Sequence, residues 1–142
     1  MSPDPGAANC KDCLCLASRQ LAQALTRLYE RHLRPHGIHV TQFTALAILR
    51  RGPATMGELA KAIGIERTTL SRNLVRLEAQ GWVQITGDAS DARSRIVTLT
   101  NKGDSKLGAV LPAWQEAQSV AMAVVGDGAG DALRDLAHKS MS

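Results

Sequence analysis

The sequence predicts a mainly α-helical protein that carries one small β-hairpin. Over most of the 142 residues, apolar side chains recur at spacings of three, four and seven, as on one face of a helix. Capping residues, glycines and prolines divide this pattern into several helices. Two short β-like runs lie between residues 82 and 99 and flank a polar segment, which is typical of a hairpin.

The composition is that of an ordinary globular protein. Hydrophobic residues make up 44% and charged residues 21% of the chain, which argues against wholesale disorder. We expect no membrane association, because no apolar stretch reaches the ~18 residues that a spanning helix needs. The N-terminus lacks the basic start and apolar segment of a secretory signal, so we expect a cytoplasmic protein. The net charge of +4 permits a polyanionic partner, although coding bias could also explain the many arginines.

The first half of the chain is predicted to form two helices after a tail. Residues 1–12 hold two prolines and little apolar surface, which predicts a flexible tail. A helix is expected over 13–34, because Pro35 ends it. Its apolar stripe consists of Leu14, Leu21, Leu25 and Leu28. A second helix is expected over 41–51, with Thr41 as its cap.

Two further helices precede the hairpin. Thr55 and Glu58 have the spacing of a capping box, which predicts a short helix over 55–62. A longer helix is expected over 66–80, closed by Gly81. Its buried stripe is predicted to be Leu70, Leu74 and Leu77.

The hairpin is expected to join strands at 82–86 and 96–99 through a nine-residue polar loop. Thr100 then caps a predicted helix over 101–125, despite Pro112 within it. The glycines at 126, 128 and 130 predict a break before a last helix over 131–139.

This order of elements is that of a winged helix-turn-helix, in which the second helix enters the major groove of DNA and the hairpin contacts an adjacent groove or the backbone. At 100° per residue, the face opposite Leu70 is polar and basic. Thr68, Arg72 and the apolar Val75 point away from Leu70, and Ser71, Thr69 and Arg76 flank them. Hydroxyls and guanidinium groups can bond base edges and phosphates. A solvated helix face is the alternative, but the hairpin that follows favours DNA.

The hairpin itself carries basic residues. Arg93 and Arg95 could enter the minor groove, where the potential of DNA is most negative. Asp91 is expected to pair with one of these arginines and to hold the tip of the wing.

Three segments resemble the MarR family of multiple antibiotic resistance regulators. The run at 91–100 is similar to the family's wing motif, the run at 69–83 to its recognition helix and entry strand, and the run at 41–46 to the preceding helix. The resemblance covers about residues 14–140. It predicts a winged DNA-binding domain over 41–100 and a helical dimerisation region over 13–40 and 101–142.

The resemblance implies a homodimeric repressor of transcription that binds double-stranded DNA at a pseudo-palindromic operator. It assigns Thr68, Ser71, Arg72 and Arg76 to the major groove. Arg93 is assigned to the minor groove, with Asp91 supporting the wing, and Thr55 to a phosphate. No cofactor is expected.

The signal that such a regulator senses stays open between three interpretations. Members of the family bind small aromatic or phenolic ligands, for which Leu28, His36, His39 and Phe43 are the candidate residues. The alternative is redox sensing by Cys10, Cys13 and Cys15 at the start of the first helix, where a thiol is more easily ionised and oxidised. The same cysteines could bind a metal ion, but their spacing is loose and we predict no metal site.

Enzyme function is not expected. The glycines of 126–130 follow a helix instead of a strand, so they do not form a phosphate-binding loop. No nucleophile with its base can be assembled from spacing. A winged domain used only for protein contacts is a further alternative, because the net charge of residues 55–100 is close to neutral. Steep salt dependence of binding would distinguish DNA from a protein partner.

Overall fold

The computed structural model describes residues 10–140, except the side chains of Cys10 and Ala92. It confirms a mainly helical fold with a small antiparallel sheet. The predicted tail falls largely outside the described residues, and its last part, Cys10–Asp12, forms a short 3-10 turn. The helices are α1 (Leu14–Leu33), α2 (Val40–Leu49), α3 (Met56–Ile63), α4 (Arg67–Ala79), α5 (Asn101–Val125) and α6 (Asp127–Ser140). The strands are β1 (Ala54–Thr55), β2 (Val83–Asp88) and β3 (Asp91–Leu99).

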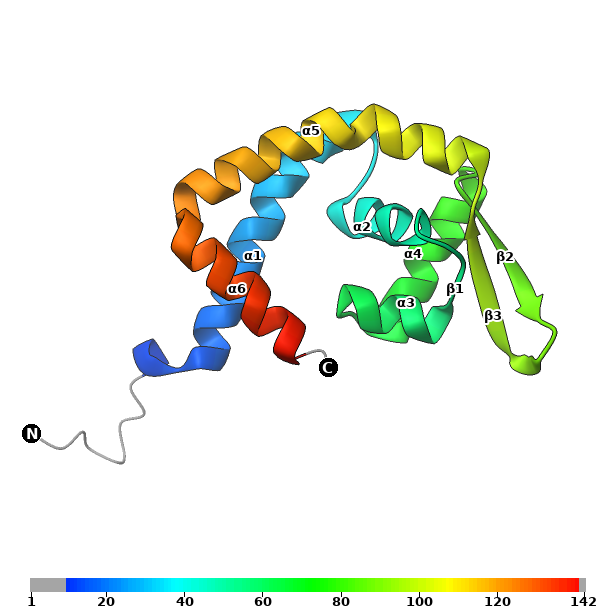
Figure 1. The fold of residues 1–142 in the computed structure, drawn as a ribbon, viewed down its shortest axis with the longest axis horizontal. Helices are drawn as coiled ribbons and strands as arrows, with labels where there is room; N and C mark the ends of the chain where they lie inside the picture. Colours follow the sequence, from blue (N-terminus) through cyan, green and yellow to red (C-terminus); the bar gives the residue numbers. More distant parts are fainter. Residues whose placement is uncertain (1–9, 141–142) are drawn as a thin grey trace, which may run out of the picture.

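Figure 1 shows two groups of elements joined by α5. The lower part of α1, the end of α5 and α6 lie at one end of the molecule. At the other end lie α2, α3, α4 and the sheet. Helix α5 continues through Pro112 and arches over the molecule, so it connects both groups. None of the helices within residues 10–140 is both long and apolar enough to span a bilayer.

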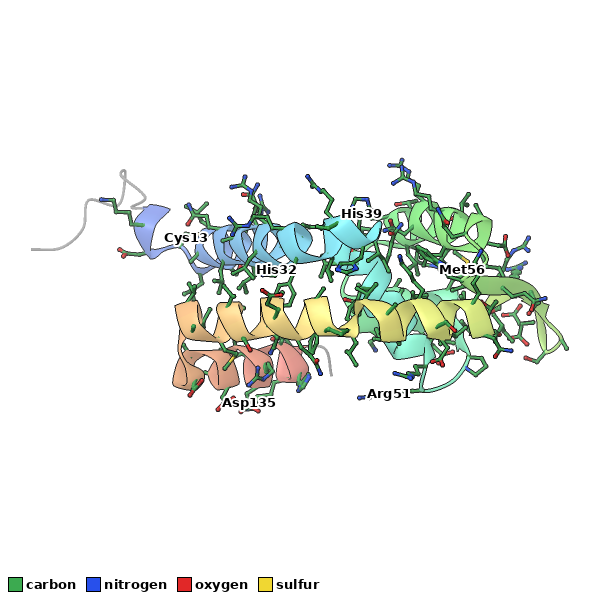
Figure 2. The ribbon with its side chains drawn as sticks, turned by 90° about the horizontal axis from the view of Figure 1, so that it is seen from above. Cys13, His32, His39, Arg51, Met56 and Asp135 are labelled. Atoms are coloured by element: carbon green, nitrogen blue, oxygen red, sulfur yellow. The ribbon has the colours of Figure 1, made fainter. Side chains whose placement is uncertain are left out.

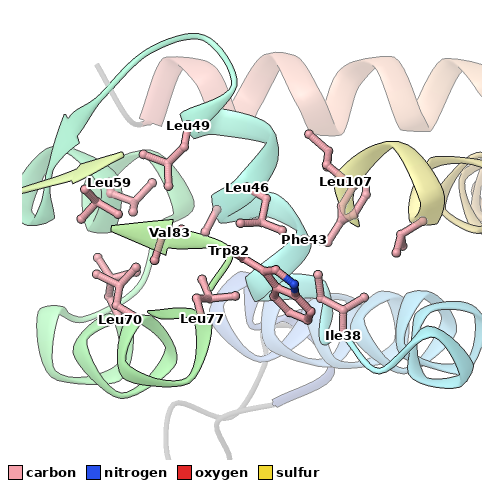
Figure 3. Close-up of a cluster of buried hydrophobic side chains, with 14 of the residues drawn as sticks. Ile38, Phe43, Leu46, Leu49, Leu59, Leu70, Leu77, Trp82, Val83 and Leu107 are labelled. Atoms are coloured by element: carbon pink, nitrogen blue, oxygen red, sulfur yellow. The ribbon is translucent and has the colours of Figure 1, made fainter. Parts of the chain in front are cut away.

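Each group has its own buried cluster. The larger one brings together α2, α3, α4, the sheet and the first half of α5, as Figure 3 shows. Leu70, Leu74 and Leu77 are fully buried in it, as the leucine stripe predicts. Phe43 stacks against Trp114 with ring centroids 5.9 Å apart, which joins α2 to α5. The smaller cluster consists of Leu28, Ala117 and Ala121, and it joins α1 to α5.

Several helix ends differ from the prediction. Helix α2 begins one residue earlier, with His39 as its N-cap, because the Gln42 side chain accepts the His39 N–H at 3.1 Å. The expected cap, Thr41, is therefore wrong. Helix α6 begins at Asp127, so Gly128 and Gly130 are helical. Only Gly126, with φ of 89°, makes the break before α6.

The hairpin is longer than predicted. The strands β2 and β3 pair from Val83 with Leu99 to Asp88 with Asp91, so a two-residue turn replaces the expected nine-residue loop. The polar composition of this segment hid its strand character, because both faces of the wing tip are exposed to solvent. The sequence analysis also missed β1, whose two residues pair with Ile96 and Val97 and place β3 at the centre of the sheet.

Candidate nucleic-acid interface

The short helix α3 begins with the predicted capping box. The Glu58 N–H donates to Thr55 Oγ1 at 3.1 Å, and the Thr55 N–H donates to the Glu58 carboxylate at 3.4 Å. These bonds satisfy exposed amides at the helix start. Thr55 is half-buried. Its hydroxyl oxygen already accepts the Glu58 N–H of the cap. A phosphate contact by Thr55 would have to share this hydroxyl.

Helix α4 presents the outward face that the sequence predicts. The side chains of Thr68, Thr69, Ser71, Arg72 and Arg76 are all exposed. Val75 on the same face is 64% exposed, although it is apolar. Leu70, Leu74 and Leu77 hold the opposite face in the core, so the orientation of the exposed face is determined by packing.

The wing is tied directly to α4 by Glu78. Its carboxylate accepts the backbone N–H of Ile85 at 2.9 Å. Because β2 is an edge strand, this N–H would otherwise have no protein partner. A groove of about 230 Å³ lies between α4 and the wing and is lined by Ser71, Val75, Glu78, Ile85 and Arg95, among others. The sequence analysis gave Glu78 no role, because its partner is a backbone N–H, which no side-chain pattern marks.

The wing arginines lie on the flank of the hairpin rather than at its tip. Arg93 and Arg95 belong to β3 and both are exposed. They alternate with Ser94, so they project from the same face of the strand. The Arg93 backbone N–H donates to Asp91 Oδ1 at 3.0 Å. Asp91 therefore holds the local backbone. Within residues 10–140 it forms no ion pair with a wing arginine, which corrects that expectation.

The turn of the wing is organised by Asp88. Its Oδ1 accepts both the Ser90 hydroxyl at 2.7 Å and the Ser90 backbone N–H at 2.9 Å. The hydrogen bond from the hydroxyl, followed by that from the backbone, holds the pKa of Asp88 below its ordinary value. The carboxylate thus stabilises the two-residue turn in its ionised form.

Hydrogen bonds of the Thr100 side chain connect the segment just before β2 to the start of α5. Its hydroxyl donates to the Gly81 carbonyl at 2.6 Å and accepts the Gly103 N–H at 3.0 Å. Gly81, with φ of 77°, follows the C-cap residue Gln80 of α4, so it lies one position beyond the cap instead of forming it. The position of the wing is therefore coupled through Thr100 to α5.

The candidate ligand residues do not gather in one place. Phe43 is buried in the larger cluster and Leu28 in the smaller one. His36 and His39 are exposed at the joint between α1 and α2, and His39 Nδ1 lies 3.2 Å from the Glu30 carboxylate. The two histidines are therefore accessible to a solute, whereas the two apolar candidates are not.

An apolar cavity lies elsewhere, between α1, α5 and α6. Its volume is about 150 Å³, and Tyr29 and Arg134 form part of its wall. Desolvation raises the pKa of Tyr29, which Arg134 partly offsets. None of the four candidate ligand residues lines this cavity.

The candidate redox residues lie at the start of α1. Cys13 is the N-cap of this helix, and the Leu16 N–H lies 3.5 Å from its Sγ. Cys13 and Cys15 are both exposed free thiols. The side chain of Cys10 lies outside the described part. Among the described side chains, no three His, Cys, Asp or Glu residues converge on a point where a metal ion could bind.

Comparisons with known proteins agree with this geometry. A family model described as MarR family matches residues 36–94. The HTH-type transcriptional repressor NicR of Pseudomonas putida is 29% identical over 130 residues, which cover 86% of this chain and 82% of NicR. The HTH-type transcriptional regulator YwoH of Bacillus subtilis is 33% identical over 88 residues, which cover 61% of this chain and 64% of YwoH. The matched part is thus a little under two thirds of the length of YwoH.

A solved structure gives a longer match. The M. tuberculosis transcriptional regulator MosR in complex with DNA is 41% identical, with a TM-score of 0.77, and the match covers 89% of this chain and 92% of MosR. All three relatives are transcription regulators rather than enzymes. Together with the capped helix α3, the exposed face of α4 and the wing, these matches show that the chain belongs to the MarR family of transcription regulators.

Proposed function

We propose that the protein is a homodimeric repressor that binds a pseudo-palindromic operator and is released by a small aromatic or phenolic ligand. The observation that carries this proposal is the exposed face of α4, held outward by a fully buried leucine stripe beside an arginine-bearing wing. Helix α4 would enter the major groove through Thr68, Thr69, Ser71, Arg72 and Arg76. Arg93 and Arg95 would reach the minor groove or its phosphates.

Two relatives support DNA binding and repression. MosR has been crystallised in complex with DNA, and NicR carries the name of a repressor. The recognition face of this chain offers hydroxyls for phosphates and base edges. It also offers Arg72 and Arg76, whose planar guanidinium groups suit bidentate contacts with guanine.

The exposed apolar side chains support a homodimer. Of the eight large apolar side chains exposed within the described residues, seven lie on α1, α5 and α6. They are Leu14, Leu16, Leu21, Val120, Val124, Leu133 and Leu136. Such a surface is typical of a protein interface. A two-fold dimer would place its recognition helices one turn of DNA apart, about 34 Å.

The release step rests on His36 and His39, which are exposed and could meet an acidic ligand at the joint between α1 and α2. Leu28 and Phe43 are buried, so a ligand that reached them would have to displace packed side chains. Movement of this joint would reorient α2 and, through the core, α4. Such a ligand would thereby weaken DNA binding in a cytoplasmic regulator.

Selection from a library of random DNA duplexes tests the proposal. The selected duplex is labelled, and its binding is followed by fluorescence anisotropy between 50 and 300 mM KCl. We expect tight binding that weakens steeply with salt, and a palindromic consensus with half-sites about 10 base pairs apart. Arg72→Ala should weaken binding by about 1–3 kcal/mol for each contact with a base that it removes, whereas Arg51→Ala, in the exposed segment after α2, should not.

Further arms of the same assay test the signal. An aromatic acid that releases the duplex from the wild type but not from a His36→Ala/His39→Ala variant supports the ligand site. Release by peroxide, restored by a thiol and absent from a Cys10/Cys13/Cys15→Ser variant, favours the cysteines instead. Failure to enrich any duplex sequence contradicts sequence-specific DNA binding.

A further inference from the structure

The outer face of α1 carries a row of arginines that the function above does not use. Arg27, Arg31 and Arg34 follow one another at spacings of four and three, so they lie on one side of the helix. At 100° per residue they lie about 60–120° from Leu28, on a flank of the helix beside the face that packs on α5. All three arginines are exposed, and no described residue forms an ion pair with them. We call them the α1 arginine row.

A shallow hollow of about 510 Å³ accompanies the α1 arginine row, and its lining also includes Ala24, Thr26 and Glu30. Glu30 is the single acidic residue of α1, and its carboxylate is already engaged. One oxygen accepts the Val40 N–H at 2.7 Å, and the other lies 3.2 Å from His39 Nδ1. The positive charge of the row is therefore not neutralised by a direct partner.

The α1 arginine row is connected toward the recognition helix through His39, whose Nδ1 lies 3.2 Å from the carboxylate of Glu30 in the same hollow. Figure 2 shows nitrogen-tipped side chains along the outer edges of α1 and α4, which project in the same direction. His39 also lines a second hollow, together with Gly37, Arg76 and Gln80, among others. The contact of Glu30 with His39 thus connects the hollow of the α1 arginine row to the hollow beside Arg76 of α4. Arg51 is labelled at the opposite edge of the molecule.

We propose that the α1 arginine row binds phosphates of the DNA backbone, in addition to the contacts of α4 and the wing. This inference rests on the proposed function, because it needs DNA seated on α4. The row extends over about 10 Å at 1.5 Å per residue, which equals the rise of about three nucleotides of one strand. Arginine suits this role because its guanidinium group donates two parallel hydrogen bonds to a phosphate.

The shape of the hollow favours a DNA backbone over a small anion. Sites for small molecules enclose most of the ligand surface. Among the described residues of the chain, this hollow is lined by α1 and the residue after it, Arg34, so no second element of residues 10–140 encloses a small molecule there. An extended, convex strand of phosphates needs no second wall. The charges of the row would position the duplex without reading its sequence.

Anisotropy titrations of the full chain test the proposal with two duplexes of equal length, the selected operator and a shuffled sequence. In the Arg27→Gln/Arg31→Gln variant, the removal of each phosphate contact should weaken binding about 5-fold at 0.15 M salt. It should also lower the slope of log K against log salt by about 0.9. The loss of affinity should be equal for both duplexes, since contacts with phosphates carry no information about the base sequence. Arg51→Gln removes the same charge from the opposite edge and should change neither quantity.

The outcomes separate this inference from the proposed function. Arg72→Ala should reduce the preference for the operator over the shuffled duplex, whereas the Arg27→Gln/Arg31→Gln variant should keep that preference. If the wild type binds the operator with steep salt dependence and the Arg27→Gln/Arg31→Gln variant has the same affinity and slope, the α1 arginine row does not contact DNA. If the Arg27→Gln/Arg31→Gln variant loses binding of inorganic phosphate but keeps its binding to DNA, the proposal is likewise overturned. If the wild type binds no DNA, the proposed function fails first and this inference fails with it.

Discussion

The close packing between the wing and α5 leaves no room for a side chain at Gly103. Gly103 lies in the first turn of α5, buried under the start of β2. A Cβ at this position would lie 2.0 Å from the Trp82 carbonyl oxygen and 2.7 Å from Leu99 Cδ1. The Trp82 oxygen cannot easily move away, because it accepts the Thr100 N–H at 3.1 Å. Gly103→Ala must therefore displace backbone.

The expected loss of stability follows from two opposing effects. Overpacking a tight site costs about 1–3 kcal/mol, and a clash with backbone belongs at the upper end. Alanine is favoured over glycine inside a helix by about 1 kcal/mol, which offsets part of this cost. We expect Gly103→Ala to lower the free energy of unfolding by about 2 kcal/mol. Gly108 in the same helix is the matched control, because it is exposed and a Cβ there would meet nothing within 4 Å.

Thermal unfolding followed by circular dichroism, with all proteins at one concentration, measures both variants. We expect Gly103→Ala to lower Tm by about 5 °C or more and Gly108→Ala to raise it by a few degrees. Both substitutions gain the same helix propensity, so the difference between them reports the clash. Equal or higher Tm for Gly103→Ala than for Gly108→Ala would show that Gly103 and Trp82 do not approach each other this closely.

Two further predictions concern the wing. Glu78→Ala removes the acceptor of the Ile85 N–H, so we expect faster amide hydrogen exchange at Ile85 and a loss of at most about 1 kcal/mol of stability. The control variant Glu78→Gln can still accept this hydrogen bond and should protect the amide. Equal exchange in the wild type and both variants would contradict the role of Glu78. Ser90→Ala removes the stronger of the two hydrogen bonds to Asp88, so the pKa of Asp88 in an NMR titration should rise toward its ordinary value. Because these hydrogen bonds favour the ionised carboxylate, their contribution to stability is complete above the ordinary pKa of Asp88 and is lost as pH falls through the lowered pKa. An unchanged Asp88 pKa in Ser90→Ala would show that the Ser90 hydroxyl is not the cause of the lowered pKa.

Local signals in the sequence predicted most helices well. The capping box of Thr55 and Glu58 and the cap at Thr100 involve residues only three positions apart, so sequence spacing determines them. The leucine stripe of α4 predicted its buried face for the same reason. The N-cap of α2 was missed although its capping box of His39 and Gln42 is equally local, and a more distant contact adds to it. Glu30 of α1 binds the start of α2 at Val40, beside the N-cap His39 that replaces the expected Thr41.

The strands show the same division. A hairpin was predictable from two β-like runs, but its length was not, because the exposed wing has no apolar face to mark its residues. The two-residue strand β1 exists only through pairing with β3, which no local pattern encodes. Likewise, Gly128 and Gly130 are poor helix formers, yet Gly130 is buried in α6, where a Cβ would meet Met122 of α5 within 3 Å. Close helix packing outweighs propensity there.

The sequence by itself determined the mainly helical class, the order of elements and the polar face of α4, since these depend on spacings within a helix or a hairpin. The tertiary structure decided which surfaces stand together. It separated Leu28 from Phe43 into two cores and brought Glu78 to the edge of β2. It also brought His39, which contacts Glu30 beside the α1 arginine row, to the hollow at Arg76 of the recognition helix. These relations depend on contacts between different elements. The separation of the two cores follows from α5, whose first half packs in the larger cluster and whose second half packs in the smaller one.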